Sequence, residues 1–340
     1  MGPGEQTSGP ARLVDVAREA GVSLPSVTRV LHGSAPVSDA MRDRVLAAVA
    51  TLNYHPNQAA RALKIGSSSV ISVVLSETTR HGYAATLQGV EEAARTAGYS
   101  VLIVIVEDES PGAARRAVDL SVAHSAAGVV VLEFDRAGEN VLGLVPRDLA
   151  TVSVGSADPR PRDAPHAYID DHLGARDAVH HLLDLGHETV HMVAIPGRGQ
   201  PSARVAGWAE ALAGRGAPRG LLLQAAWGPE SGYAAAQRLL DDEATVTAVL
   251  CGNDELAFGV IRGLQDAGRE VPGQVSVVGF DDIPLARFWA PALTTVRQDF
   301  VALGHRSFAL LHARLEDRPV ASTARAEAPL VVRQSSGPPP

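Results

Sequence analysis

The chain has 340 residues, of which 46% are hydrophobic, and a formal net charge of -8. This length exceeds that of one small domain and predicts two or three domains with substantial cores. Its longest apolar runs, such as residues 101–106 and 128–132, are as long as strands and too short to span a membrane. The first residues carry no apolar segment typical of a signal peptide, and the single cysteine, Cys251, excludes an internal disulfide, so we expect a cytoplasmic protein.

Two short amphipathic helices joined by a tight turn are predicted between residues 12 and 32. Apolar residues recur at helical spacing from Leu13 to Ala20, which gives the first helix one apolar face. Gly21 is expected to end that helix because glycine adopts positive φ without strain, and Ser23 is expected to cap the next helix. This arrangement is a helix-turn-helix, which is typical of DNA-binding proteins.

The second of these helices is expected to bury Val27, Val30 and Leu31 and to leave its other side chains outside. Arg29 offers a guanidinium suited to phosphate or guanine, whereas Pro25 removes one hydrogen-bonding side chain from the first turn. Bases near this turn are therefore expected to be read by apolar contact and shape. The side chains predicted to contact DNA are Ser23, Leu24, Pro25, Ser26, Arg29 and His32.

The run D-V-A-x-x-A-G-V-S-x-x-[ST]-V-[ST]-R-V-L, which ends at Leu31, resembles the headpiece of the lac repressor family of bacterial transcription regulators. Residues 42–66 resemble that family's third helix and hinge helix, although Arg12 stands where the family carries a Ser or Thr cap. The resemblance implies that Leu63 enters the minor groove as a wedge. The hinge residues that it places against DNA are Asn57, Ala60, Leu63 and Lys64.

Charge is distributed unevenly along the chain. Residues 1–66 contain seven basic and five acidic residues, a net charge of +2, and the remainder has a net charge of -10. A slightly basic headpiece on an acidic body concentrates the attraction to phosphate at one end. An asymmetry this small is also common by chance, so it adds little to the helix-turn-helix.

Beyond residue 69, short β-branched runs alternate with helical stretches. This alternation predicts a doubly wound parallel α/β fold, and the number of strands favours two sheets. The strands are expected at residues 70–75, 101–106, 129–134, 151–154, 189–195, 221–225, 248–251 and 275–280. The helices are expected at residues 84–97, 174–185, 204–213, 232–240 and 255–267.

The family resemblance implies a two-lobed body like that of periplasmic sugar-binding proteins. The chain would then cross between lobes near residues 186, 298 and 325, and the lack of a further heptad helix implies a homodimer. The expected divisions are a disordered tail at 1–10, an all-α headpiece at 11–55, a hinge helix and linker at 56–69, and a body at 70–334, with lobe one at about 70–186 and 299–324 and lobe two at about 187–298 and 325–334.

Ligands of such folds bind at the carboxyl ends of strands, here between the two lobes. Arg204 begins a run, R-V-A-G-W, that resembles a family segment facing this cleft; a surface salt bridge is the alternative. Asn253 and Asp281 follow strands and suit hydroxyl groups, but such residues also shape turns, and Trp227 is either a sugar-stacking ring or a core side chain. The predicted effector contacts are Tyr83, Asp170, Arg204, Trp227, Asn253, Asp281 and Phe300.

We find neither a catalytic motif nor cysteine pairs with zinc spacing, and His187 is expected to pack a helix end instead of binding metal. No enzyme activity, metal or cofactor is therefore expected. The sequence predicts a dimeric repressor that binds a pseudo-palindromic DNA operator under the control of a small effector, a sugar or a sugar derivative. The rival interpretation is a carbohydrate-binding or sugar-processing protein with no DNA role, and salt-dependent DNA binding would separate the two.

Overall fold

A computed structural model describes residues 11–32, 36–54, 68–156, 164–197, 202–242 and 245–340 of the chain. The chain divides into two compact units, Met1–Ser68 and Ser69–Pro340. Each unit has its own hydrophobic core, so each is described by itself. Among the described residues, no helix has both the length and the apolar character that crossing a membrane requires.

The first unit contains three helices, α1 (Leu13–Glu19), α2 (Leu24–His32) and α3 (Asp39–Thr51). Its core confirms the predicted apolar faces, and Gly21 has φ +61° in the turn between α1 and α2. The Arg12 side chain does not cap α1, but the Asp15 carboxylate accepts a hydrogen bond from the Arg12 N–H at 3.0 Å. The buried residues of this core are Val16, Ala17, Ala20, Val27, Val45 and Ala48.

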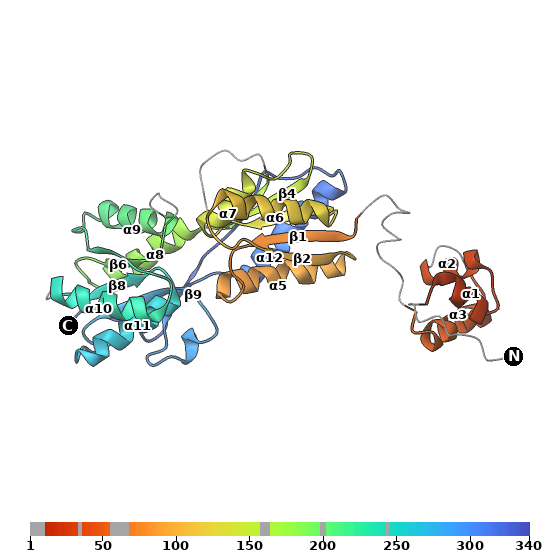
Figure 1. Cartoon of the computed structure of the whole chain (residues 1–340). Helices are drawn as coiled ribbons and strands as arrows, with labels where there is room; N and C mark the ends of the chain where they lie inside the picture. Colours follow the sequence, from red (N-terminus) through yellow and green to blue (C-terminus); the bar gives the residue numbers. More distant parts are fainter. Residues whose placement is uncertain (1–10, 33–35, 55–67, 157–163, 198–201, 243–244) are drawn as a thin grey trace. The chain divides into compact units, whose positions relative to one another are not determined.

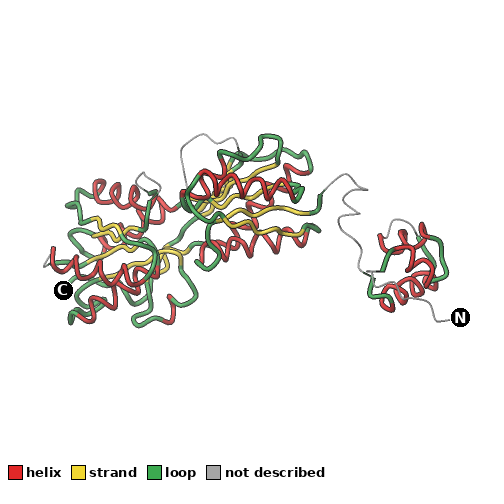
Figure 2. The backbone as a smooth tube through the Cα atoms, in the orientation of Figure 1, coloured by secondary structure: helices red, strands yellow, loops and turns green. Residues whose placement is uncertain are grey.

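The body contains two six-stranded sheets, each lying between helices (Figures 1 and 2). Each sheet forms one lobe together with its helices. We call them lobe A and lobe B, and they correspond to the expected lobe one and lobe two. The sheet of lobe A is wholly parallel, in the order β11-β5-β4-β3-β1-β2. Its strands are β1 (Val70–Leu75), β2 (Ser100–Ile105), β3 (Gly128–Leu132), β4 (Ala150–Ser156), β5 (His166–Ile169) and β11 (Thr323–Ala326).

The helices of lobe A cover both faces of its sheet (Figure 1). Alternate residues of β1 and β3 pack against α5 and α12 on one face and against α6 and α7 on the other, so the strands are buried on both sides. The helices are α5 (His81–Thr96), α6 (Pro111–Ala123), α7 (Arg136–Leu142) and α12 (Phe300–Leu315).

Lobe B has the same layered design, with strand order β12-β10-β9-β8-β6-β7 and only β12 antiparallel among these pairs. Its strands are β6 (His191–Ala194), β7 (Leu222–Gln224), β8 (Ala248–Cys251), β9 (Ser276–Asp281), β10 (Thr294–Arg297) and β12 (Leu330–Val331). Its helices are α8 (Asp171–Asp184), α9 (Ala203–Gly214), α10 (Pro229–Asp242) and α11 (Asp254–Asp266), with a 3-10 turn, η1 (Ala286–Phe288).

The doubly wound α/β class is confirmed, and every strand and helix predicted beyond residue 69 is present with its ends shifted by no more than three residues. The predicted hinge helix lies outside the described residues. The first crossing between lobes differs from the expectation. It lies at Asp170, between β5 and α8, instead of near residue 186, because α8 packs against α9 and the sheet of lobe B. The other two crossings lie between β10 and α12 and between β11 and β12.

Helices α5 and α12 approach closely where two glycines meet. A methyl group at Gly304 would overlap the Thr86 carbonyl oxygen and lie 2.7 Å from the Val90 nitrogen. A methyl group at Gly89 would likewise overlap the Val301 carbonyl oxygen. The absence of side chains at these two positions therefore sets the distance between the two helices.

Candidate functional site

The predicted DNA-contacting face of α2 is present, with one correction. Ser23, Leu24, Pro25 and Arg29 are exposed. Ser26 is only 8% exposed, and its hydroxyl lies 2.9 Å from that of Ser23, so the expectation that it faces outward is wrong. The reason is helical geometry: the residue lies next to Val27 and one turn before Val30, on the flank of the buried face.

This geometry tests exposure and no contact with DNA, so the contacts of the exposed residues of α2 also stay predictions. His32 is the last residue of α2. The hinge candidates Asn57, Ala60, Leu63 and Lys64 lie outside the described residues. Their DNA contacts stay predictions.

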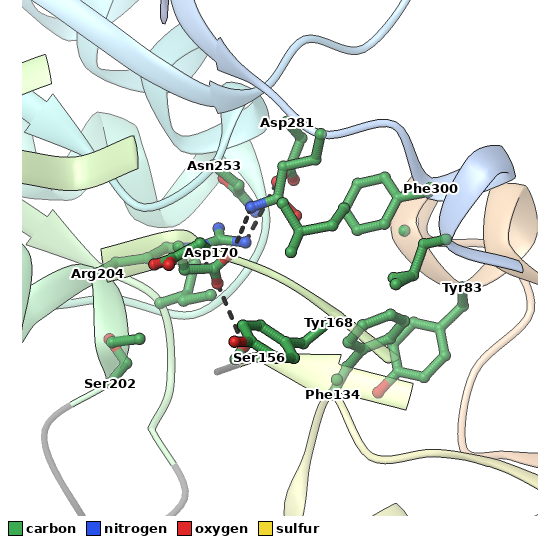
Figure 3. Close-up of a pocket in the computed structure, with 18 of the residues that line it drawn as sticks. Tyr83, Phe134, Ser156, Tyr168, Asp170, Ser202, Arg204, Asn253, Asp281 and Phe300 are labelled. Carbon is green, nitrogen blue, oxygen red and sulfur yellow. Dashed lines mark hydrogen bonds and ion pairs between the residues drawn. The ribbon is translucent and has the colours of Figure 1, made fainter. Parts of the chain in front are cut away.

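A cavity of about 1150 Å³ lies between lobes A and B. All seven of the side chains predicted to contact an effector line it, although they come from segments spread over more than 200 residues. All of them except Trp227 are labelled in Figure 3. They are Tyr83 in α5, Asp170 before α8, Arg204 in α9, Trp227 after β7, Asn253 before α11, Asp281 at the end of β9 and Phe300 at the start of α12. Their contact with a ligand stays a prediction.

The side of the cavity formed by lobe A, which includes α12, is aromatic. The Tyr83 ring meets that of Phe134 edge to face, with centroids 5.1 Å apart, and Phe134 meets Phe300 at 6.0 Å (Figure 3). His81 packs edge-on against Phe300 at 5.8 Å. Burial lowers the pKa of His81, so this ring adds apolar surface to the cavity more than positive charge.

Tyr83 also has a polar contact outside the aromatic group. Its hydroxyl donates to a carboxylate oxygen of Asp135 at 2.8 Å, and Ser76 donates to the same oxygen. Burial, together with the neighbouring Asp135 charge, raises the pKa of the tyrosine well above its ordinary value. The ring is therefore held as a neutral phenol facing the cavity.

The opposite side of the cavity, in lobe B, is polar and centres on Arg204. Its Nε donates to Asp171 at 3.0 Å and a terminal nitrogen donates to Asp281 at 3.4 Å, while the other contacts the Gly252 carbonyl (Figure 3). The guanidinium also lies 4.1 Å from the centroid of the Phe280 ring. Arg204 is 8% exposed, so the alternative of a surface salt bridge is replaced by a buried ion-pair network.

Asp171 belongs to this network and was not among the predicted site residues. Besides Arg204, it accepts hydrogen bonds from Gln298 at 2.6 Å and from Ser156 of lobe A at 3.2 Å. The D-D pair at 170–171 is a signal for it in the sequence, but only the fold shows which carboxylate faces Arg204. Phe134, Tyr168 and Gln298 also line the cavity and were not predicted.

The turn-shaping alternative describes much of what Asn253 does, and Asp170 also makes local structural bonds. The Asn253 side chain accepts from the Leu256 N–H at 2.8 Å, which caps α11, and donates to the Trp227 carbonyl at 3.1 Å. Asp170 caps α8 and pairs with Arg325 at 3.0 Å. Both residues line the cavity, so their local bonds fix the shape of its polar wall.

Trp227 is partly exposed at the cavity and is not a core residue. The Arg80 guanidinium, which belongs to lobe A, lies 5.1 Å from the centroid of its ring. This cation–π contact joins the two lobes at the edge of the cavity.

The histidine considered for a metal site, His187, makes other contacts. His187 bonds to Thr247, Ser276 and the Gly337 carbonyl, in keeping with the packing role expected for it. Among the described residues, no group of three or more His, Cys, Asp or Glu side chains is arranged to hold a metal ion.

Two buried carboxyls at the end of β9 and the start of α11 are held in unusual states. Burial raises the pKa of Asp254 well above 3.8, and its oxygens accept hydrogen bonds from the Thr295 hydroxyl and the Ile283 N–H. These bonds give Asp254 a structural role. Burial also raises the pKa of Asp281 to about 7, although the Arg204 charge opposes the shift.

Stability is expected to depend on pH through Asp281. Between about pH 4 and pH 7 this carboxyl binds its proton in the folded state and not in the unfolded state. Its contribution is therefore complete below pH 4 and is lost as the pH rises through 7. The free energy of unfolding in urea should be measured at pH 5 and at pH 8. It should change less between these two pH values for Asp281→Asn than for the wild type, and an equal change would contradict the raised pKa of Asp281.

The chain thus joins a DNA-binding type of headpiece to a two-lobed α/β body with a ligand-sized cavity, which defines the class of ligand-responsive DNA-binding regulators. Residues 12–57 match the model of bacterial regulatory proteins of the lacI family, and residues 179–336 match a periplasmic binding protein-like domain. The chain belongs to the lacI family of bacterial regulatory proteins.

Three relatives support this assignment. The HTH-type transcriptional regulator GalR of Escherichia coli (strain K12) is 30% identical, over 96% of this chain and 95% of its own. The structure of the lac repressor dimer bound to operator and the anti-inducer ONPF has a TM-score of 0.88 and 29% identity, covering 97% of this chain and 100% of that chain. The transcriptional regulator CelR–cellobiose complex has a TM-score of 0.69 and 29% identity, and the match covers 96% of this chain and 99% of that chain.

Proposed function

We propose that this protein is a cytoplasmic, homodimeric transcriptional repressor that binds a pseudo-palindromic operator under the control of a small sugar or sugar derivative. The observation that carries the proposal is one chain with both a recognition helix that exposes Arg29 and a cavity between two lobes. Two headpieces related by twofold symmetry would place their α2 helices in successive major grooves. The relative solved as a dimer on operator supports this arrangement.

The two unlike sides of the cavity support a sugar ligand. Rings such as Phe134 and Phe300 suit the apolar faces of a sugar, and the opposite wall offers carboxylates that accept hydrogen bonds from hydroxyl groups. A structurally similar regulator was solved with cellobiose. The proposed effector therefore contacts both lobes at once.

Contact with both lobes gives the effector a means of control. A ligand shifts a conformational equilibrium only by its difference in affinity for the two states, and moving a regulator almost fully from one state to the other needs roughly 5 kcal/mol. Ser156 of lobe A bonds to Asp171 of lobe B at the cavity, and Arg80 lies over Trp227. A ligand that strengthens or replaces such contacts would favour one arrangement of the lobes.

The DNA half of the proposal predicts that Arg29→Ala weakens operator binding by about 10-fold to 100-fold, because a guanidinium contact to guanine or phosphate contributes about 1–3 kcal/mol. Operator fragments selected from a random DNA library by the wild-type protein provide the ligand for fluorescence anisotropy. Arg115→Ala, an exposed arginine of α6 in the body, is the matched control and should change affinity by less than about twofold.

The same binding assay tests the effector half. Sugars are first screened for a rise in the unfolding temperature, because a ligand that binds only the folded state stabilises it by mass action. Sugars that do so should change the affinity for operator. A lack of salt-dependent DNA binding, or turnover of a bound sugar, would favour the rival class of carbohydrate-binding or sugar-processing proteins.

A further inference from the structure

The lining of the cavity contains more carboxylates than cations. Among the described residues that line it, the guanidinium groups are those of Arg80 and Arg204. The carboxylates are those of Asp170, Asp171, Asp254, Glu255 and Asp281. Even with Asp254 counted as neutral, because burial raises its pKa, the acidic side chains outnumber the guanidinium groups. The cavity therefore favours positive ligands over negative ones, because buried charges interact more strongly than charges in water.

Both guanidinium groups are already engaged. Arg204 is bonded to Asp171 and Asp281, so two carboxylates already match its single charge. Arg80 lies over the Trp227 ring and 3.9 Å from Glu77. An anionic ligand in this cavity would meet no cation whose charge is free of a carboxylate partner among these lining residues.

The carboxylates differ in how well they are satisfied. Asp170 pairs with Arg325, Asp171 accepts hydrogen bonds from Arg204, Gln298 and Ser156, and both oxygens of Asp254 are bonded.

Asp281 has a weaker arrangement. Its side chain is 16% exposed and bonds to Arg204 through one oxygen at 3.4 Å; within the described part of the chain its second oxygen is left without a partner. Glu255, half-buried in the first turn of α11, adds a second negative charge close enough to act on Asp281.

We propose that the effector carries a cationic amine that lies against Asp281 and Glu255, so that it is an amino sugar or another hydroxylated amine and not a phosphorylated or otherwise anionic sugar. This inference rests on the proposed function, since it describes the ligand of the same cavity. An ammonium group would give Asp281 the full-strength partner that Arg204 does not provide, in the form of a charge-assisted hydrogen bond.

The charges around Asp281 add a pH dependence to this ligand preference. Asp171 on α8 and Glu255 on α11 favour its protonated form, and Arg204 on α9 favours its charged form; burial gives the largest effect and raises its pKa to about 7. A bound ammonium favours the charged carboxylate, so binding releases a proton near neutral pH. The affinity for an alkylamine ligand should therefore rise from pH 6 to pH 8, since such an amine stays protonated throughout this range.

The test compares matched ligands by calorimetry with the full-length protein at pH 7, where the amines of both 2-amino and 6-amino sugars are mostly protonated. Glucose, galactose and mannose are each measured as the neutral sugar, the 2-amino and 6-amino derivatives, and the 6-phosphate. In at least one series an amino derivative should bind about tenfold more tightly than the neutral sugar, and the phosphate should bind more weakly than either. A neutral or phosphorylated sugar that binds most tightly overturns the inference.

Variants separate the charge of the cavity from the charge of the protein as a whole. Asp281→Asn should remove most of the preference for the amine, and Glu255→Gln, which changes a half-buried side chain, should reduce it in the same direction. Asp184→Asn removes a carboxylate that is 62% exposed on α8 and does not line the cavity, so it should leave the preference unchanged.

The outcomes distinguish this inference from the proposed function. An amine preference that survives in both Asp281→Asn and Glu255→Gln overturns the inference. Neutral sugars that bind and alter operator affinity while the amines do not bind also overturn it and leave the proposed function standing. If no sugar of any kind changes operator affinity, both fail.

Discussion

Replacing Arg204 by alanine is expected to lower the free energy of unfolding of the body by about 3–5 kcal/mol, because it leaves buried carboxylates and a buried carbonyl without their partner. The same variant should lose its response to the effector, since the polar wall of the cavity is built around this guanidinium. Chemical denaturation measures the first effect, and operator binding with and without effector measures the second.

Two comparisons make this prediction specific. Arg215→Ala removes an exposed arginine at the end of α9 that pairs with Asp184. This variant should lower the free energy of unfolding by less than about 1 kcal/mol. Adding Asp171→Asn to Arg204→Ala should recover part of the lost stability, because the uncompensated charge is then removed. Operator affinity should persist where the body stays folded, because the headpiece has its own core; its parallel loss would contradict the prediction.

Gly304→Ala is expected to destabilise the body by about 3 kcal/mol. The added methyl group would meet backbone atoms of α5, which cannot move aside as a flexible side chain can. Because α12 carries Phe300 and α5 carries Tyr83, separating the helices should also disturb the aromatic side of the cavity and weaken effector binding. Thermal unfolding and ligand calorimetry on the same preparation measure the two effects together.

Gly214→Ala is the matched control for this substitution. Gly214 is the last residue of α9, and a methyl group there would meet no atom within 4 Å. Alanine has the higher helix propensity, so this variant should be neutral or stabilised by a few tenths of a kcal/mol. A Gly304→Ala variant as stable as Gly214→Ala would show that the helices can separate without cost.

The sequence predicted the central strands of both sheets because they are buried on both faces and read as continuous apolar runs. Strands β1, β3 and β8 are of this kind. It did not predict β5, β10, β11 or β12, which are short. Their segments H-A-Y-I, T-T-V-R and T-A-R-A mix polar and apolar residues, and their place in the sheet depends on partners far away in the chain.

Site residues at strand ends could be predicted because parallel strands end on the same edge of a sheet. This rule brought Asn253 and Asp281 to the cavity. What one sequence could not reveal is which side chains already satisfy one another: Gln298 bonds to Asp171 across 127 positions, and Arg204 to Asp281 across 77. These pairings turn an expected ligand-binding arginine into one whose charge is balanced internally.

The three crossings between the lobes also determine how the body unfolds. In the sequence, β11 and α12 of lobe A follow most of the elements of lobe B. Lobe B in turn is completed by β12 and by hydrogen bonds that join Ser335 and Gly337 to β9 and β10. Neither lobe is a continuous stretch of chain that is complete on its own. Calorimetry should therefore record one cooperative transition for residues 69–340, with a separate transition for the headpiece, whose contacts are local.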